Sequence, residues 1–214
     1  MASVDSSAPQ AALTQPLSGP NTWKGFDLAD LRKFHVQRTS NGIEVPYFTR
    51  AGQHWRSKVF LEDGRSWWLG ESKAQIPYGL ETLTLGSKAV ILTEGESDAL
   101  ALRLAFPTLA VLGIPGASSW RNQWTRCLEG FDAVYLSFDA DRAGEKLTAS
   151  VLESVPGACP IHLPAGADTR DVLQRLGRAA YAALARHARV AREFNETHRA
   201  AWAVRDAWKA VTAA

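Results

Sequence analysis

Apolar residues in the second half of the chain come in short continuous runs, separated by stretches long enough for helices. Such runs are typical of strands that are buried on both faces of a sheet. The four runs are Ala89–Thr93, Thr108–Gly113, Ala133–Phe138 and Cys159–Leu163. Alternating strands and helices predict a parallel sheet with right-handed crossovers.

Helices are expected between and after these strands. The first follows Ser97, with Leu100 and Leu104 spaced four residues apart. Further helices are predicted from Ser118 or Ser119 through Leu128, from Arg142 to Ser154, and from Thr169 to Leu176. The Ala- and Arg-rich remainder from Arg178 predicts one or two more helices.

A different pattern comes before residue 87. Ile43–Phe48 and His54–Leu61 have the composition of two strands around an Arg-Ala-Gly turn, and Trp67–Leu69 predicts a short third strand. These elements predict a small antiparallel unit. The leader, rich in Ala, Ser, Pro and Gln, is expected to be disordered.

The chain is therefore expected to be an α/β protein with four segments. The parallel sheet is preceded by a small, basic, β-rich subdomain and followed by a helical extension. The predicted segments are a leader at 1–22, the small subdomain at 23–86, the α/β domain at 87–177 and the helical extension at 178–214.

The two cysteines, Cys127 and Cys159, are far apart and lack the spacing of a zinc site. We expect reduced thiols packed as small apolar groups, which fits a cytoplasmic protein. No apolar run reaches membrane-spanning length, so no membrane partner is expected. The middle of the chain is acidic, since residues 81–180 carry 12 acidic against 9 basic side chains, and it lies between two mildly basic flanks.

Several acids fall where predicted strands end. Glu94 ends the first strand, Asp139 and Asp141 follow the third, and Asp168 follows the fourth. The carboxyl edge of an open α/β sheet is where ligands bind. Carboxylates gathered there repel one another unless a hard cation is bound, and a set of oxygen ligands without His or Cys favours Mg²⁺ or Mn²⁺. Asp98 is expected to cap or brace a helix N-terminus.

Two motifs carry a family resemblance. Thr93-Glu94-Gly95-Glu96-Ser97-Asp98-Ala99-Leu100 resembles the Glu-Gly motif of Toprim domains, and Phe138-Asp139-Ala140-Asp141-Arg142-Ala143-Gly144 resembles their Asp-x-Asp motif. Toprim domains occur in primases, topoisomerases, nucleases and small recombination or RNA-processing proteins. The match covers roughly residues 88–176. It implies a Toprim fold and a site in which Glu94, Asp139 and Asp141 are catalytic and, with Asp168, bind metal.

The flanking segments are similar to the catalytic core of DnaG-type primases and to the primase half of phage and Twinkle-type primase-helicases. The resemblance rests on Gly52 with Lys58, on Gly70-Glu71-Ser72-Lys73, on Pro77-Tyr78-Gly79-Leu80, on Leu112–Ser118, and on Leu163-Pro164 leading to Asp168-Thr169-Arg170-Asp171. It implies that Lys58, Lys73, Arg50 and Arg56 bind nucleotide or nucleic acid. Interleaved aromatic residues could stack on bases or pack in the core of the small subdomain.

The resemblance implies magnesium-dependent synthesis of short RNA primers on single-stranded DNA, in the replication of a phage, plasmid or other mobile element. The expected partners are the DNA template, nucleoside triphosphates, and a separate helicase or zinc-binding, template-reading protein. The chain has no zinc-ligand cysteines and no GxxxxGK[ST] motif. Two alternatives therefore stay open: a metal-dependent nuclease, and a catalytically silent nucleic-acid-binding module.

Overall fold

The structure is a computed structural model that describes residues 21–70, 75–116 and 118–212. The chain divides into two compact units between Ala74 and Gln75. Residues 75–86 lie in the second unit, because Tyr78 bridges Gly113 of the parallel sheet. The division into four segments inferred from sequence stays a prediction.

The first unit contains a four-stranded antiparallel sheet of order β3-β4-β5-β6. Its strands are β3 (Gln37–Thr39), β4 (Gly42–Phe48), β5 (His54–Phe60) and β6 (Ser66–Trp68). A smaller pair, β1 (Thr22–Trp23) and β2 (Phe26–Asp27), leads into α1 (Leu28–Leu31) and the 3-10 turn η2 (Arg32–Phe34). β1 therefore starts at the last residue of the expected leader, and residues 1–20 of that leader lie outside the described residues. The antiparallel β region expected before the parallel sheet is confirmed.

The core of the small sheet is built from the alternation of its central strands. Val45, Tyr47 and Val59 are fully buried, and the ring of Tyr47 contacts that of Trp68 edge-on at 4.7 Å between centroids. Burying large side chains of this kind contributes about 1.5–3 kcal/mol each. Tyr47 and Trp68 therefore hold the sheet together, whereas Trp55 is 41% exposed.

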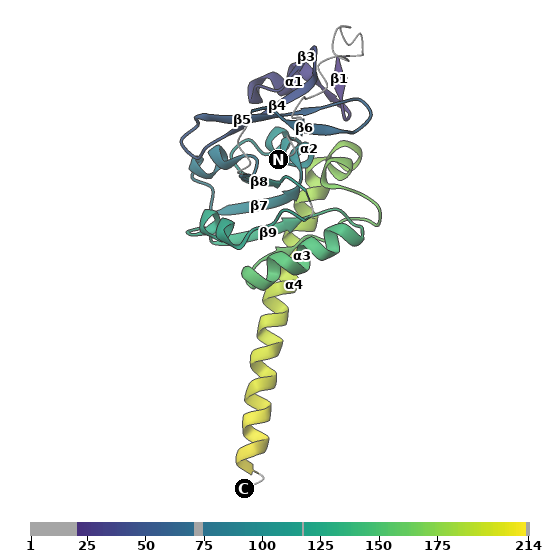
Figure 1. Cartoon of the computed structure of the whole chain (residues 1–214). Coiled ribbons are helices and arrows are strands. Elements are labelled where there is room, and N and C mark those ends of the chain that lie inside the picture. Colours follow the sequence, from purple (N-terminus) through teal and green to yellow (C-terminus); the bar gives the residue numbers. More distant parts are fainter. Residues whose placement is uncertain (1–20, 71–74, 117, 213–214) are drawn as a thin grey trace, which may run out of the picture. The chain divides into compact units, whose positions relative to one another are not determined.

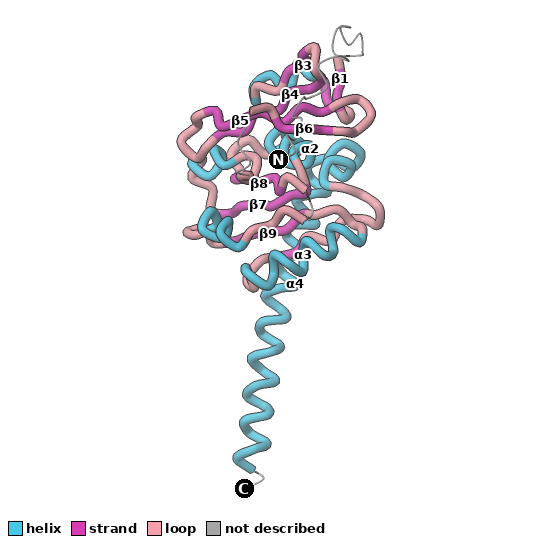
Figure 2. The backbone as a smooth tube through the Cα atoms, in the orientation of Figure 1, coloured by secondary structure: helices cyan, strands magenta, loops and turns pink. Residues whose placement is uncertain are grey.

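The second unit contains a parallel four-stranded sheet of order β10-β9-β7-β8, of which β9, β7 and β8 are labelled in Figures 1 and 2. Its strands are β7 (Ala89–Glu94), β8 (Ala110–Ile114), β9 (Ala133–Ser137) and β10 (Cys159–Pro160). β7 pairs with both β8 and β9, so the strand that ends at Glu94 is central. The predicted α/β fold class is confirmed, although β10 is only two residues long, shorter than the run from which it was predicted.

Helices cover both faces of this sheet. The elements are η3 (Leu80–Thr84), α2 (Glu96–Ala105), η4 (Asn122–Leu128), α3 (Arg142–Ser154) and α4 (Thr169–Thr212). On one face, Trp124 and Leu128 of η4 and Leu147 and Val151 of α3 pack into the core formed by alternate strand residues. On the other face α2 packs against α4, where Phe106 contacts Tyr181 at 6.1 Å between ring centroids.

One helix prediction needs correction. The segment expected to be helical from Ser118 or Ser119 is helical only from Asn122, as a 3-10 helix, and it has no side-chain cap. Ser119 instead donates to the Gly116 carbonyl at 2.7 Å, which closes a turn. The short helix expected from Thr169 to Leu176 and the helical segment expected from Arg178 are confirmed, because α4 is broken between them at Gly177 (φ 81°, ψ 172°).

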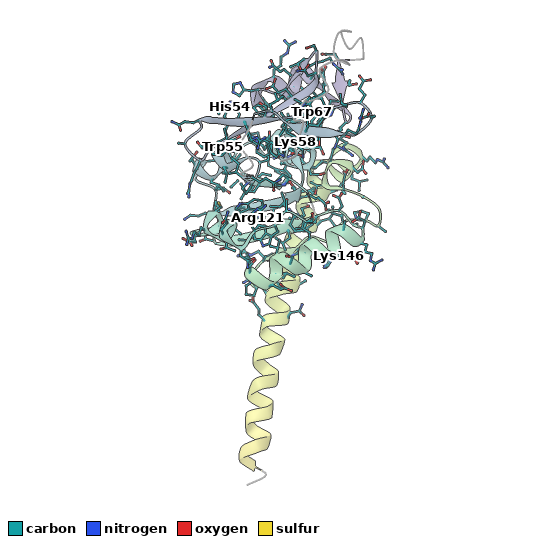
Figure 3. The ribbon with its side chains drawn as sticks, in the orientation of Figure 1. His54, Trp55, Lys58, Trp67, Arg121 and Lys146 are labelled. Atoms are coloured by element: carbon teal, nitrogen blue, oxygen red, sulfur yellow. The ribbon has the colours of Figure 1, made fainter. Side chains whose placement is uncertain are left out.

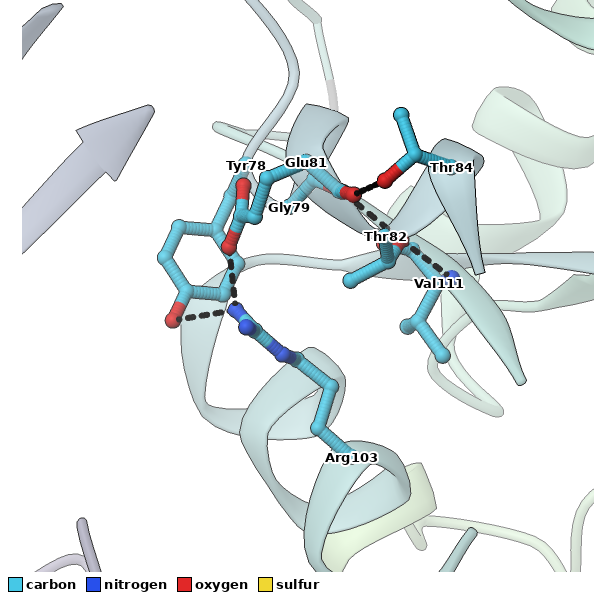
Figure 4. Close-up of polar contacts among 7 residues, drawn as sticks. All are labelled: Tyr78, Gly79, Glu81, Thr82, Thr84, Arg103 and Val111. Atoms are coloured by element: carbon cyan, nitrogen blue, oxygen red, sulfur yellow. Dashed lines mark hydrogen bonds and ion pairs between the residues drawn. The ribbon is translucent and has the colours of Figure 1, made fainter. Parts of the chain in front are cut away.

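A buried polar network attaches η3 to α2 and β8 (Figure 4). Arg103 forms a 2.9 Å ion pair with Glu81 and donates to the Tyr78 hydroxyl at 3.1 Å. Thr82 bonds both the N–H (2.9 Å) and the carbonyl (3.0 Å) of Val111. Burial raises the pKa of Tyr78, so it stays a neutral hydrogen-bonding group. The network fixes the segment that leads into β7 and thereby the strand that carries Glu94.

Candidate metal centre at the carboxyl edge of the parallel sheet

Glu94 ends β7 and is half-buried. Gly95 (φ 89°) turns the chain directly after it and donates its N–H to the Ile114 carbonyl at 2.8 Å. The Glu94 oxygen Oε2 is buried and accepts no hydrogen bond. Burial, followed by the charges of Asp139 and Asp141, raises the pKa of Glu94 from 4.5 to about 7. The three acids are therefore near enough to interact electrostatically.

Asp139 and Asp141 follow β9, and their loop is fixed by the start of α3. Asp141 is the N-cap of α3, and its Oδ1 accepts hydrogen bonds from the N–H groups of Ala143 (2.8 Å) and Gly144 (2.9 Å). A Cβ on Gly144 would lie 2.1 Å from the Asp139 carbonyl oxygen. This position therefore requires glycine, because the helix backbone packs directly on the Asp139 backbone. Oδ2 of Asp141 remains to face a ligand.

The loop that carries Asp168 lies against the Asp139 loop. Ala140 donates its N–H to the Ala167 carbonyl at 3.1 Å, and its own carbonyl accepts from Gly166 at 3.2 Å. Asp168 caps α4 by accepting from the Asp171 N–H at 2.6 Å, and it forms a 2.7 Å ion pair with Arg170. Both of its oxygens thus already bond within the protein. Its role as an assisting metal ligand stays a prediction.

Asp98 lies in the first turn of α2 and is buried, with 3% of its surface exposed. Its Oδ1 accepts the Arg170 N–H at 2.8 Å, so the expected bracing of a helix N-terminus, here that of α4, is confirmed. Burial, followed by the charge of Asp168, raises the pKa of Asp98 to about 7. Arg170 was missed as a site residue. Its backbone N–H binds Asp98 and its guanidinium binds Asp168, and its place in the Asp168-Thr169-Arg170-Asp171 segment was the available signal.

The carboxyl edge has the donor chemistry of a hard-cation site. Glu94 supplies a buried oxygen without a hydrogen bond, and the charges of Asp139 and Asp141 help to raise the pKa of Glu94. Within the described residues, no group of three or more His, Cys, Asp or Glu side chains lies close enough to hold a metal ion. Mutual repulsion separates bare carboxylates, so a bound cation would have to draw these side chains together. The residues fit a divalent cation in type, and their assignment as ligands stays a prediction.

Of the predicted nucleic-acid residues, Arg56 and Lys58 lie on β5 of the small sheet, and Figure 3 labels Lys58. Lys58 on β5 places its ammonium 5.0 Å from the centre of the Phe60 ring and 5.7 Å from that of Trp68. Arg50 lies exposed in the turn after β4. Lys73 lies outside the described residues.

Arg56 takes an internal position. It is 8% exposed and donates to the carbonyl oxygens of Leu69 (3.2 Å) and Gly70 (3.3 Å). Its guanidinium also stacks 4.6 Å from the centre of the Trp68 ring. These contacts hold the end of β6, and the predicted role of Arg56 in binding nucleic acid stays a prediction.

Comparison with known proteins agrees with this architecture. The sequence model of the Toprim-like family matches residues 91–173. The Gene 57 protein of Mycobacterium phage D29 is 32% identical over 104 residues, which are 48% of this chain and 66% of the relative, just under two thirds of its length.

Two solved structures share the fold. The primase fragment of the bacteriophage T7 primase-helicase aligns with a TM-score of 0.65 at 19% identity, over 75% of this chain and 71% of that one. A DnaG primase catalytic domain bound to single-stranded DNA aligns with a TM-score of 0.59 at 18% identity, over 69% and 51%.

Residues 91–173 thus form a Toprim-like domain. The fold of the chain is shared with primase catalytic cores. The carboxyl edge that carries Glu94, Asp139 and Asp141 lies inside the matched region. Within the residues that the structure describes, no helix is both long and apolar enough to span a membrane.

Proposed function

We propose that this chain is a primase-type nucleotidyltransferase that makes short RNA primers on single-stranded DNA, in the replication of a phage, plasmid or other mobile element. One observation carries the proposal. Glu94 presents a buried oxygen without a hydrogen bond toward the charges of Asp139 and Asp141, at the carboxyl edge of a Toprim sheet. The likeness to a phage gene product and to two primase cores supports it.

The proposed cofactor is Mg²⁺ or Mn²⁺. Glu94, Asp139 and Asp141 would hold it, with Asp168 assisting. A divalent cation there supplies charge neutralisation for the phosphates of an incoming nucleotide. Oxygen-only ligands of this kind suit these hard cations better than zinc.

The side chains contribute distinct parts of the chemistry. Asp141 is held by two backbone N–H groups, so its free oxygen is oriented before any ligand binds. Glu94, with a pKa raised to about 7, can accept a proton near neutral pH and is the candidate general base toward the attacking 3′-hydroxyl. The Arg170 guanidinium and the α4 N-terminus hold Asp168 in place.

Lys58, Lys73 and Arg50 are the proposed contacts for nucleotide phosphates or template. Lysine ammonium groups act there as compact point charges. The proposed partners are single-stranded DNA and nucleoside triphosphates, together with a separate helicase or zinc-binding, template-reading protein.

The decisive experiment incubates the full chain with single-stranded DNA, labelled ribonucleotides and either Mg²⁺ or Mn²⁺, and scores both oligonucleotide synthesis and strand cleavage. We expect synthesis, reduced on the order of 10²–10³-fold in Glu94→Gln. Lys58→Ala should raise the nucleotide concentration required by about tenfold, as for the loss of one charge-assisted contact. Lys88→Ala, at the opposite end of β7, is the matched control and should leave synthesis unchanged.

Cleavage without synthesis would replace the primase assignment with a nuclease. If neither reaction occurs after a helicase or a zinc-binding partner is added, a silent binding module takes its place.

A further inference from the structure

An open groove of about 560 Å³ lies on the Toprim unit, between the segment that follows β8 and the exposed side of α3. All of the residues that line it belong to the second unit. Its lining combines an aromatic ring, two cations and two hydroxyls, contributed by Ser118, Trp120, Arg142, Ala143, Lys146 and Ser150.

The aromatic wall of the groove is fixed in orientation. The indole N–H of Trp120 donates to Ser154 Oγ at 3.0 Å. Its ring meets the buried Trp124 ring edge-on, with centroids 5.9 Å apart and planes at 82°. An indole held by both contacts cannot turn freely, so the part of Trp120 that lines the groove offers a preorganised surface for a flat ligand.

The cations of the groove are spaced along one side of a helix. Arg142 and Lys146 are four residues apart on α3, so they follow one another at a rise of about 6 Å. Both are exposed, and neither forms an ion pair with a described residue. Two unneutralised charges in a row, beside a ring, suit a ligand with successive phosphates and bases.

The groove also begins beside the candidate metal centre. Arg142 directly follows Asp141, which caps α3 through the N–H groups of Ala143 and Gly144. A strand whose phosphates contact Arg142 and Lys146 would therefore run toward, or away from, the carboxyl edge of the sheet.

We propose that this groove binds single-stranded nucleic acid, with a base stacked on Trp120 and successive backbone phosphates held by Arg142 and Lys146. The Toprim unit then has a strand-binding site of its own, in addition to the small sheet. The choice of a nucleic-acid strand as the ligand rests on the proposed function. Its test does not, because binding can be measured without metal and without turnover.

The test is fluorescence anisotropy of labelled oligothymidylate and oligouridylate with the full chain in EDTA, across a range of salt concentrations. Arg142→Ala with Lys146→Ala should weaken binding and make the slope of log affinity against log salt shallower by about 1.4, as for the loss of two phosphate contacts to a single strand. Lys88→Ala with Arg186→Ala removes the same charge from exposed positions outside the groove and should leave the slope unchanged. Equal slopes in the two double variants would overturn the proposal.

A matched pair of variants tests stacking. Trp120→Phe and Trp120→Leu both lose the hydrogen bond to Ser154, but only phenylalanine keeps an aromatic face. Binding should be about 5- to 100-fold weaker in Trp120→Leu than in Trp120→Phe. Similar affinities for the two variants, with similar melting temperatures, would contradict a stacked base.

Cross-linking of the unaltered protein avoids any folding defect. A single strand that contains bromodeoxyuridine should cross-link on irradiation to the peptide between Arg103 and Arg121, which carries Trp120. Adducts confined to the small unit would overturn the groove assignment. Adducts at Trp120 in a protein that makes no primers would keep the groove and remove the primase function.

Discussion

Glu94 and Asp98 lie four residues apart, and both have a pKa raised to about 7 with burial as the largest cause. Their surroundings differ. Asp98 is almost fully buried and accepts the Arg170 N–H at 2.8 Å. Glu94 is half-buried, and its buried oxygen accepts no hydrogen bond. The Asp98 carboxylate is thus used within the protein, whereas the buried Glu94 oxygen is, in our proposal, a ligand for a bound cation.

The comparison shows that a raised pKa does not by itself identify a functional acid. The partners of each oxygen separate the two cases. Asp98 holds the N-terminus of α4 against α2, whereas Glu94 faces the charges of Asp139 and Asp141. Substitution of Asp98 should therefore mainly lower the free energy of unfolding, whereas substitution of Glu94 should mainly weaken cation binding.

The largest effect is expected from Gly144→Ala. Its Cβ would lie 2.1 Å from the Asp139 carbonyl oxygen, so α3 or the Asp139 loop must move. We expect a loss of about 3 kcal/mol of unfolding free energy, which corresponds to a fall of about 6–12 °C in Tm. Circular dichroism melting measures it. Gly157→Ala is the control, because a Cβ on Gly157 would lie 3.8 Å from its nearest neighbour, a side-chain nitrogen of Arg192. Equal melting of both variants would refute the close approach.

The next effect is expected on the structural side of the comparison. Asp98→Ala removes a buried acceptor from the Arg170 N–H and should cost about 2 kcal/mol, or about 4–8 °C in Tm. Asp98→Asn keeps an acceptor oxygen and should lose less than half as much. A Tm within 1 °C or so of the unaltered protein for Asp98→Ala would show that this bond does not support the fold.

The smallest effect has the opposite sign. Glu94→Gln removes one of three like charges and should stabilise the metal-free protein at pH 8 by about 1 kcal/mol, after allowance for solvent screening, or about 2–4 °C. The folded-state pKa of Glu94, about 7, exceeds its usual 4.5. Ionisation of this group therefore costs stability as the pH rises from about 4.5 to 7. Melting across that range in EDTA should fall less steeply in Glu94→Gln, and parallel curves would contradict the charge interaction.

Much of the fold was predictable because its signals are local. Continuous apolar runs marked the strands of the parallel sheet, and the Arg50-Ala51-Gly52 turn marked the reversal between β4 and β5. The ends of elements were less predictable. The sequence between Ser118 and Leu128 offers two serines as helix caps, but Ser119 closes a turn on Gly116 instead.

The candidate site was predictable only in part, for the same physical reason. Strand ends and motifs placed Glu94, Asp139 and Asp141 at one edge of the sheet. The contact of Asp98 with Arg170 joins residues 72 positions apart, and no local sequence pattern predicts it. The burial of Arg56 could not be predicted either. A cation among aromatic residues is the same sequence pattern whether the arginine is buried against a ring or exposed to bind nucleic acid.

The central claim is that Glu94, Asp139 and Asp141 form a divalent-cation site, whereas Asp98 is structural. Isothermal titration calorimetry with Mg²⁺ and with Mn²⁺ tests it most directly on four proteins: the unaltered chain, Glu94→Gln, Asp139→Asn with Asp141→Asn, and Asp98→Asn. Binding should be retained in Asp98→Asn, weakened in Glu94→Gln and lost in the double variant, with all four proteins folded. The same cation affinity in the double variant as in the unaltered chain would contradict the account.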